Sequence, residues 1–240
     1  MGKHVIAVFD VDGTLINGSS ERIFIKHLLR EHIISAKDLI NAGILGTKSM
    51  LSSNALKYYS PYVYLTKVNK YYLCRKKYDT IKAILEKHVM KHIFSLLFKE
   101  AVELISNFKK NNIEVILLSA SLEIIVSEIA HALGIEKFYA TGLTINPEDN
   151  TFTGTINGCY YYGKKKASLL EKNFPHEKYD YSNSYAYGNN SSDVPFLTLF
   201  GNRYIINPKS YDFFLNFLIK KYKINVLRWK KTMKGEESRI

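Results

Sequence analysis

Residues 5–15 join a short apolar run to two closely spaced acids. The run, Val5 to Phe9, is rich in β-branched and aromatic side chains, which predicts a short strand buried on both faces. Asp10 and Asp12 follow, and Gly13 permits a sharp turn, so the strand should end here with both acids exposed. Open α/β sheets bind ligands at this end of their strands, where acids could hold a hard cation or attack an electrophile. An ordinary turn with two solvated acids is the alternative, and the later motifs decide between them.

The composition is typical of a globular protein without a membrane span. A chain of 240 residues can form one large domain or a core with a smaller inserted domain. It has no run of about 18 apolar residues and no apolar N-terminal segment of signal-peptide type, so neither a membrane-spanning helix nor secretion is expected. Cys74 and Cys159 form no metal-binding pattern. We therefore expect reduced thiols and a cytoplasmic protein.

The formal net charge is +12 at pH 7, with lysines spread along the chain. Such a surface could attract nucleic acid, anionic lipid or phosphorylated metabolites. No groove-reading motif and no helix with a dense basic stripe is present, so no nucleic-acid partner is expected. A solvated basic surface is the simplest interpretation, and peripheral contact with anionic lipid stays open.

Residues 17–95 have apolar side chains at helical spacing and no convincing strand pattern. The expected elements are a helix capped by Ser19–Ser20 and running to about His32, a helix from Ser35 ending near Gly43 or Gly46, a Tyr-rich stretch broken at Pro61, and two or three helices up to about Leu97. We interpret this segment as an all-helical insert that follows the first strand. That is the position of a lid over the strand's carboxyl end.

Strands and helices alternate through the rest of the chain, which predicts an α/β fold. The expected elements are a helix over 93–110, a strand over 113–118, a helix over 122–133 ended by Gly134, a strand over 138–141, a hairpin of strands over 143–145 and 151–156, a helix from Gly163, a strand over 184–187, a short helix with Phe196 and Leu197, a strand over 203–208 and a helix over 213–219. We expect residues 223–229 to pack back on the core and residues 230–240 to be mobile.

Three further groups of residues could carry chemistry. Ser119 follows the second strand at the start of a helix, a natural place for phosphate if Ser121 caps that helix instead. One of the lysines 164–166 could reach the site and neutralise both a carboxylate and a phosphate, while at least one faces solvent. Asn189 and Asp193 follow a short strand, and Ser192 could cap the next helix. A simple cap or a solvated helix face is the plain alternative for the serines and lysines.

With these four elements in this order, the sequence resembles the haloacid dehalogenase (HAD) superfamily of phosphohydrolases, over nearly the whole chain. It is most similar to the phosphoserine-phosphatase-like subfamily IB. The matches are Asp10-Val11-Asp12-Gly13-Thr14 to the first motif, Ser119 to the second, Lys166 to the third with Lys164 and Lys165 as fallbacks, and Gly188 to Asp193 to the fourth motif G-D-x-x-x-D. The resemblance implies a Rossmann-like core with a mainly parallel sheet, formed by residues 1–16 and 96–240. It also implies an all-helical cap of the C1 type at residues 17–95.

The same resemblance implies a Mg²⁺-dependent phosphatase mechanism. Asp10 would attack phosphorus and form an aspartyl-phosphate, and Asp12 would act as general acid and base. The implied phosphate ligands are Ser119, Ala120 and Lys166, and the implied Mg²⁺ ligands are Asp10, the Asp12 carbonyl, Asn189 and Asp193. The substrate would be a small phosphorylated metabolite or a lipid head-group phosphate, and the enzyme a monomer or homodimer.

Two departures from the family pattern affect function. Asn189 stands where the fourth motif has its first Asp, which removes one negative charge and predicts weaker Mg²⁺ binding. Ser19 replaces the Glu that phosphoserine phosphatases carry nine residues after the nucleophile, and Ser119-Ala120-Ser121 replaces their Ser-Gly-Gly, so phosphoserine is not expected. Asn189 favours one alternative, a weak or inactive member that binds a phosphorylated ligand or a partner. Bulk charge alone favours another, a nucleic-acid-associated protein.

Overall fold

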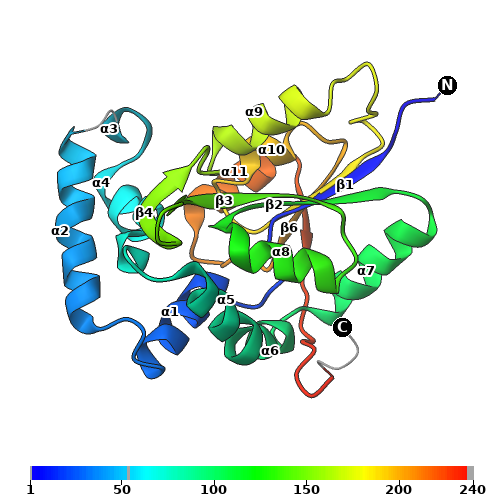
Figure 1. Cartoon of the computed structure of the whole chain (residues 1–240). Coiled ribbons are helices and arrows are strands. Elements are labelled where there is room, and N and C mark those ends of the chain that lie inside the picture. Colours follow the sequence, from blue (N-terminus) through cyan, green and yellow to red (C-terminus); the bar gives the residue numbers. More distant parts are fainter. Residues whose placement is uncertain (1, 53–54, 237–240) are drawn as a thin grey trace.

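The computed structural model describes residues 2–52 and 55–236 (Figure 1). In that part of the chain, seven strands form one sheet in the order β4-β3-β2-β1-β5-β6-β7. The strands are β1 (Ile6–Phe9), β2 (Glu114–Leu122), β3 (Lys137–Asn146), β4 (Thr151–Asn157), β5 (Tyr185–Gly188), β6 (Asn202–Ile206) and β7 (Asn225–Leu227). Neighbouring strands are parallel except for the β3–β4 hairpin. The predicted α/β class with a mainly parallel sheet is confirmed.

Strand β1 lies at the centre of the sheet and is buried on both faces, as predicted. Ala7 and Phe9 belong to the apolar cluster that contains α7 (Lys99–Lys110) and α8 (Glu123–Ala132). Ile6 and Val8 belong to the opposite cluster, together with α9 (Lys164–Asn173), α10 (Val194–Leu197) and α11 (Phe213–Lys221). Figure 1 shows these two helical layers on either side of the strands. The chain places β2 on one side of β1 and β5 on the other, which makes this the topological switch point of the sheet.

Between β1 and α7 the described residues form helices and isolated bridges. The helices are α1 (Ser20–Arg30), α2 (Ala36–Ser52), α3 (Ala55–Tyr58), α4 (Pro61–Val63), the π-helix η1 (Tyr64–Val68), the 3₁₀-helix η2 (Tyr71–Leu73), α5 (Tyr78–Ile84), the π-helix η3 (Leu85–Val89) and α6 (Met90–Ser95). Figure 1 shows α2 at the side of the molecule, apart from the layers that cover the sheet. The helical character of this segment is as expected, whereas its division from the core at residues 17 and 95 stays a prediction.

Helix α2 continues past both glycines at which we expected it to end. Gly46 is buried inside the helix, where a Cβ atom would lie 2.3 Å from Nδ2 of Asn69. That amide donates to the carbonyl of Ala42 at 2.8 Å, so the Asn69 side chain is clamped directly against the helix backbone. Gly46 therefore permits close packing rather than ending the helix.

The expected helix over 93–110 is two helices. Helix α6 ends at Ser95 and α7 begins at Lys99, because Leu97 and Phe98 between them bond to the residues just after the first motif. Leu97 forms an isolated bridge with Ile16, and the Phe98 amide donates to the Leu15 carbonyl at 2.9 Å. The apolar period continues across this break, so the sequence pattern could not indicate it.

The segment after β6 packs against the body of the protein. Strand β7 pairs with β6, and Trp229 is buried, as expected for residues 223–229. The expectation of a mobile tail is wrong for residues 230–236: the Met233 amide donates to the Leu97 carbonyl at 2.8 Å, and its side chain is buried. Residues 237–240 lie outside the described part of the chain. In that part, no helix is both long and apolar enough to cross a membrane.

Candidate active site

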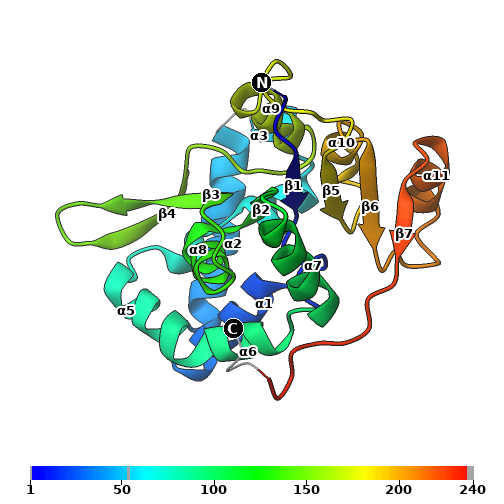
Figure 2. The same cartoon turned by 90° about the vertical axis from the view of Figure 1, so that its right-hand side faces the viewer.

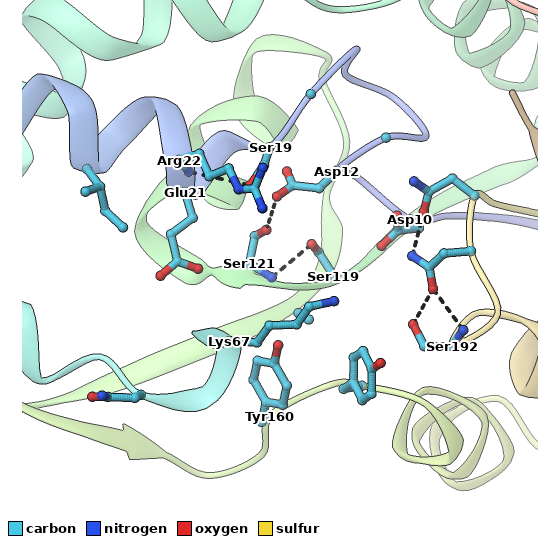
Figure 3. A pocket seen from close by; sticks show the side chains of 18 of the residues that line it. Asp10, Asp12, Ser19, Glu21, Arg22, Lys67, Ser119, Ser121, Tyr160 and Ser192 are labelled. Atoms are coloured by element: carbon cyan, nitrogen blue, oxygen red, sulfur yellow. Dashed lines mark hydrogen bonds between the residues drawn. The ribbon is translucent and has the colours of Figure 1, made fainter. Parts of the chain in front are cut away.

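A cavity of about 730 Å³ lies at the carboxyl ends of β1, β2 and β5 (Figure 3). All seven residues predicted for the site line it, namely Asp10, Asp12, Ser119, Ala120, Lys166, Asn189 and Asp193. Its other wall comes from α1, α2, α4 and η1, through residues that include Arg22, Leu39, Tyr62 and Lys67. The cavity therefore lies between the end of the sheet and the helical segment, where a lid was expected.

Asp10, Lys166 and Asp193 form a buried charged cluster on the sheet side of this cavity. The Lys166 ammonium donates to Oδ1 of Asp10 at 2.6 Å and to Oδ1 of Asp193 at 2.7 Å. The Thr14 hydroxyl donates to the other Asp10 oxygen at 3.0 Å. Of the three lysines considered from sequence, Lys166 is the one in contact with Asp10, because it lies on the buried side of the first turn of α9. Lys165 instead donates to the Tyr59 hydroxyl, and Lys164 is exposed.

Burial perturbs the titration of this cluster. It raises the pKa of Asp10 to about 7, despite the opposing attraction of Lys166, and the nearby Asp193 charge adds to the rise. Burial alone would lower the pKa of Lys166, but its attraction to Asp10 and Asp193 raises that pKa above its ordinary value. Lys166 is therefore a cation held between two carboxylates.

Asp12 is held separately from this cluster, by groups at the ends of two elements. The Ser20 amide, at the start of α1, donates to Oδ1 of Asp12 at 3.1 Å. The Ser121 hydroxyl donates to Oδ2 of Asp12 at 2.9 Å (Figure 3). Burial raises the pKa of Asp12, and the hydrogen bonds from Ser20 and Ser121 oppose that rise. A carboxyl group with a raised pKa is suited to donate a proton at neutral pH.

Two expected caps at the site are wrong. Ser121 does not cap α8, because β2 runs on to Leu122 and α8 begins only at Glu123. The Ser121 hydroxyl is used by Asp12 instead. Ser192 donates its hydroxyl to the side-chain oxygen of Asn190, and α10 follows Asp193 without a side-chain cap. A contact across the site thus replaces the expected cap by Ser121, and a contact within the loop replaces the expected cap by Ser192.

Ser119 and Ala120 lie within the last residues of β2. The Ser119 hydroxyl is buried and accepts the Ser121 amide at 3.1 Å, and the Ala120 carbonyl accepts the Thr141 hydroxyl at 2.9 Å. Both residues line the cavity. Helix α8 starts four residues after Ser119. The N-terminus of this helix therefore does not lie directly beside Ser119, contrary to what the sequence had predicted for phosphate binding.

The loop after β5 is organised by Asp193. The amides of Asn189 and Asn190 donate to Oδ2 of Asp193 at 3.0 Å and 3.3 Å, while its Oδ1 accepts from Lys166. The Asn189 side chain lies against Gly13, where a Cβ atom would come 1.9 Å from Nδ2 of Asn189. Gly13 also has a φ of +79°, so both its conformation and this contact require glycine. The loop is thus fixed against the first motif.

The oxygen groups at the site fit a hard cation, although with little negative charge. In the described part of the chain, no three His, Cys, Asp or Glu side chains come together as a metal cage. Asp10 contributes a carboxylate and Asp12 a main-chain carbonyl. Asn189 contributes a side-chain oxygen, which also accepts a hydrogen bond from Nδ2 of Asn190 at 2.8 Å. Such all-oxygen sets suit Mg²⁺. Asp193 accepts two hydrogen bonds at Oδ2 and one at Oδ1, so most of its acceptor capacity is used by the loop and by Lys166.

The cavity wall also holds an ion pair that the sequence did not indicate. Glu21 lines the cavity, and its carboxylate accepts both the Lys70 ammonium, at 2.5 Å, and the Tyr72 hydroxyl, at 2.6 Å. Lys70 is only 1% exposed. The partners are about fifty residues apart in sequence and no local pattern joins them, so sequence alone carried no signal for this pair.

Comparison with known proteins identifies the family. A model of the haloacid dehalogenase-like hydrolases matches residues 7–198. The chain belongs to this family. Among relatives of this HAD hydrolase, a probable phosphatase from Mycobacterium tuberculosis is 28% identical over 215 residues, which cover 84% of this chain and 68% of the relative.

Two solved structures share the fold of this HAD hydrolase. A Bordetella pertussis protein of unknown function superimposes with a TM-score of 0.73 at 19% identity, covering 94% of this chain and 99% of that protein. A phosphoserine phosphatase, solved as a phospho-aspartyl intermediate analogue, superimposes with a TM-score of 0.61 at 18% identity, covering 100% of both chains. The Rossmann-like HAD fold is thereby confirmed.

Proposed function

We propose that this HAD hydrolase is a Mg²⁺-dependent phosphatase that cleaves a phosphomonoester through an aspartyl-phosphate on Asp10. The observation that carries the proposal is the buried Lys166 ammonium, which bridges Asp10 and Asp193 at the wall of a cavity that Asp12 also lines. A buried cation at this place can compensate the negative charge of a phosphoryl group next to a carboxylate nucleophile. The names of the mycobacterial relative and of the phosphoserine phosphatase support the same chemistry.

In the proposed reaction, an Asp10 oxygen attacks phosphorus while the bond to the leaving oxygen breaks, and Asp12 gives that oxygen its proton. Asp12 then takes a proton from water as the water attacks the aspartyl-phosphate, which releases phosphate and restores Asp10. Lys166 and the Thr14 hydroxyl orient the Asp10 carboxylate. The Ser119 hydroxyl and the backbone at Ala120 are positioned to bind phosphoryl oxygens.

We assign the Mg²⁺ ligands to Asp10, the Asp12 carbonyl and Asn189, with Asp193 supporting the loop and Lys166. When bound, the cation would offset charge on the phosphoryl oxygens and help to align them for attack. Because Asn189 is neutral, the site holds less negative charge than a set with a second carboxylate.

For the leaving group we propose a small phosphorylated metabolite or a lipid head-group phosphate, and not phosphoserine. Glu21 follows two residues after Ser19, the position at which phosphoserine phosphatases carry their Glu, but its charge is already compensated by Lys70 and its carboxylate also accepts the Tyr72 hydroxyl. On the helical side, the exposed Arg22 and Lys67 line the cavity, and the Lys67 ammonium lies 5.2 Å from the centroid of the Tyr162 ring. These side chains favour a negatively charged leaving group rather than an ammonium-bearing one.

The proposal is tested by phosphate release from p-nitrophenyl phosphate, phosphoserine, sugar phosphates and lysophosphatidic acid, each with Mg²⁺ and with EDTA. We expect turnover that needs Mg²⁺, with phosphoserine among the poorer substrates. Turnover that survives EDTA would contradict the metal requirement. No turnover of any compound, while phosphorylated ligands still bind, would favour the alternative that Asn189 suggests, namely a weak or inactive member that binds a phosphorylated ligand or a partner protein.

Asn189→Asp should strengthen Mg²⁺ binding. The substitution adds a carboxylate charge beside Asp10, so the Mg²⁺ concentration for half-maximal activity should fall roughly tenfold. The matched control is Asn190→Asp, which adds the same charge one residue further along the loop and should leave that concentration nearly unchanged. A Mg²⁺ titration of phosphatase activity measures both variants, and an equal response would show that Asn189 is not a ligand.

A further inference from the structure

The first half of α11 presents aromatic side chains to solvent. Phe213 is 82% exposed, Phe214 64% and Phe217 58%, whereas Leu215 is buried and anchors the opposite side of the helix to the sheet. Tyr211, just before the helix, is also largely exposed. We call Tyr211, Phe213, Phe214 and Phe217 the aromatic face. Figure 2 shows α11 beside β7 at the outer edge of the molecule, beyond the end of the sheet.

The chain around the aromatic face is strongly basic. Residues 207–231 contain seven basic side chains, Lys209, Lys220, Lys221, Lys223, Arg228, Lys230 and Lys231, and one acid, Asp212. Asp212 is used as the N-cap of α11, where it accepts the Leu215 amide at 2.9 Å. Lys220 and Lys221 are exposed at the other end of the same helix. The aromatic face thus shares its helix with two exposed lysines, and the described part of the chain shows no salt bridge to either of them.

We propose that the aromatic face and the lysines of α11 dock this protein on an anionic lipid bilayer. A group of exposed large apolar side chains rimmed by polar ones marks an interaction site, and Phe has no polar atom that would favour water. Aromatic rings beside lysines are the combination that binds the interface of an anionic membrane, since the rings enter the acyl boundary and the lysines contact the headgroups. A second copy of this chain would bring like charges together, and a convex helix offers no groove for nucleic-acid bases.

The docked orientation would bring the cavity mouth close to the membrane. Lys209 lines the cavity, and its ammonium lies 5.6 Å from the centroid of the Tyr211 ring, so the aromatic face borders the mouth. Membrane binding itself uses none of the proposed catalytic residues. It can therefore be tested whether or not the phosphatase proposal holds.

The test is flotation with vesicles of phosphatidylcholine alone and of phosphatidylcholine with phosphatidylserine at a ratio of about 7:3. We expect the wild-type protein to bind the anionic vesicles at least about tenfold more tightly than the neutral ones. Phe213→Ser, Phe214→Ser and Phe217→Ser combined should weaken binding by about tenfold or more, because the apolar anchor is lost. Lys220→Gln should weaken it roughly fivefold.

The matched control is Ile40→Ser with Ile44→Ser, which removes exposed apolar side chains from α2 instead. This variant should bind the anionic vesicles like the wild type, and thermal unfolding followed by circular dichroism verifies that every variant is folded. Absence of binding by the wild type, binding that the phenylalanine variant retains, or an equal loss in the α2 control would each overturn the proposal. Preference for single-stranded RNA over the anionic vesicles would overturn it in favour of a nucleic-acid partner.

Discussion

Asp10→Asn should abolish phosphatase turnover, with a loss of at least about 10⁴-fold in kcat. The amide is a far weaker nucleophile than the carboxylate, and it occupies the same space between Lys166 and Thr14, so the fold should persist. The loss should therefore appear in kcat for every substrate, independent of the leaving group. Steady-state phosphate release measures it, and thermal unfolding measures the stability of the variant.

The result that would contradict this prediction is a folded Asp10→Asn protein that retains turnover within about tenfold of wild type. Such an enzyme would not use Asp10 as its nucleophile. A variant that fails to fold would be replaced by Asp10→Ser, which also lacks the carboxylate but is smaller than the native side chain.

Lys166→Met should destabilise the protein by about 3–5 kcal/mol and remove its activity. The substitution leaves Asp10 and Asp193 buried together without their cation, and Asp193 is fully buried. The pKa of Asp10, which burial already raises, would lose the opposing attraction of Lys166, so the protonated form of Asp10 would be favoured further. Because a raised carboxyl pKa favours the folded state below the unfolded pKa, the destabilisation should shrink as the pH falls toward about 4.

The control for this variant is Lys164→Met on the same turn of α9, where the side chain is exposed and should change stability by less than about 0.5 kcal/mol. Urea unfolding at neutral and acidic pH measures both proteins. Equal stability of Lys166→Met and Lys164→Met would mean that the buried contacts of Lys166 contribute nothing, which contradicts the account.

Local sequence was sufficient for the parts of the site that follow single strands. Strand β1 ends at Phe9 because acids and a glycine follow its apolar run. Strand β5 ends at Gly188, where the polar residues of the fourth motif begin. Asp12 lines the cavity as expected, because it follows a strand whose end the pattern can indicate. For the lysines 164–166 the local pattern left the choice open, and only the family resemblance selected Lys166, which lines the cavity.

Contacts between distant segments were not predictable in this way. Ser121 was expected to cap a helix, but it donates to Asp12 from the end of a longer strand. Gly46 was expected to end α2, but it makes room for Asn69. Lys70 neutralises Glu21 across about fifty residues. In each case the local pattern suits two structures, and packing with a remote segment selects one of them.

The most direct test of the central claim is to identify the residue that carries phosphate during turnover. Wild-type protein would be mixed with Mg²⁺ and a substrate, quenched in acid, digested and examined by mass spectrometry. We predict one added phosphoryl group on the peptide that contains Asp10, and none in Asp10→Asn treated alike. Phosphate on another residue, or full turnover with an Asp10 peptide that is never phosphorylated, would contradict the account.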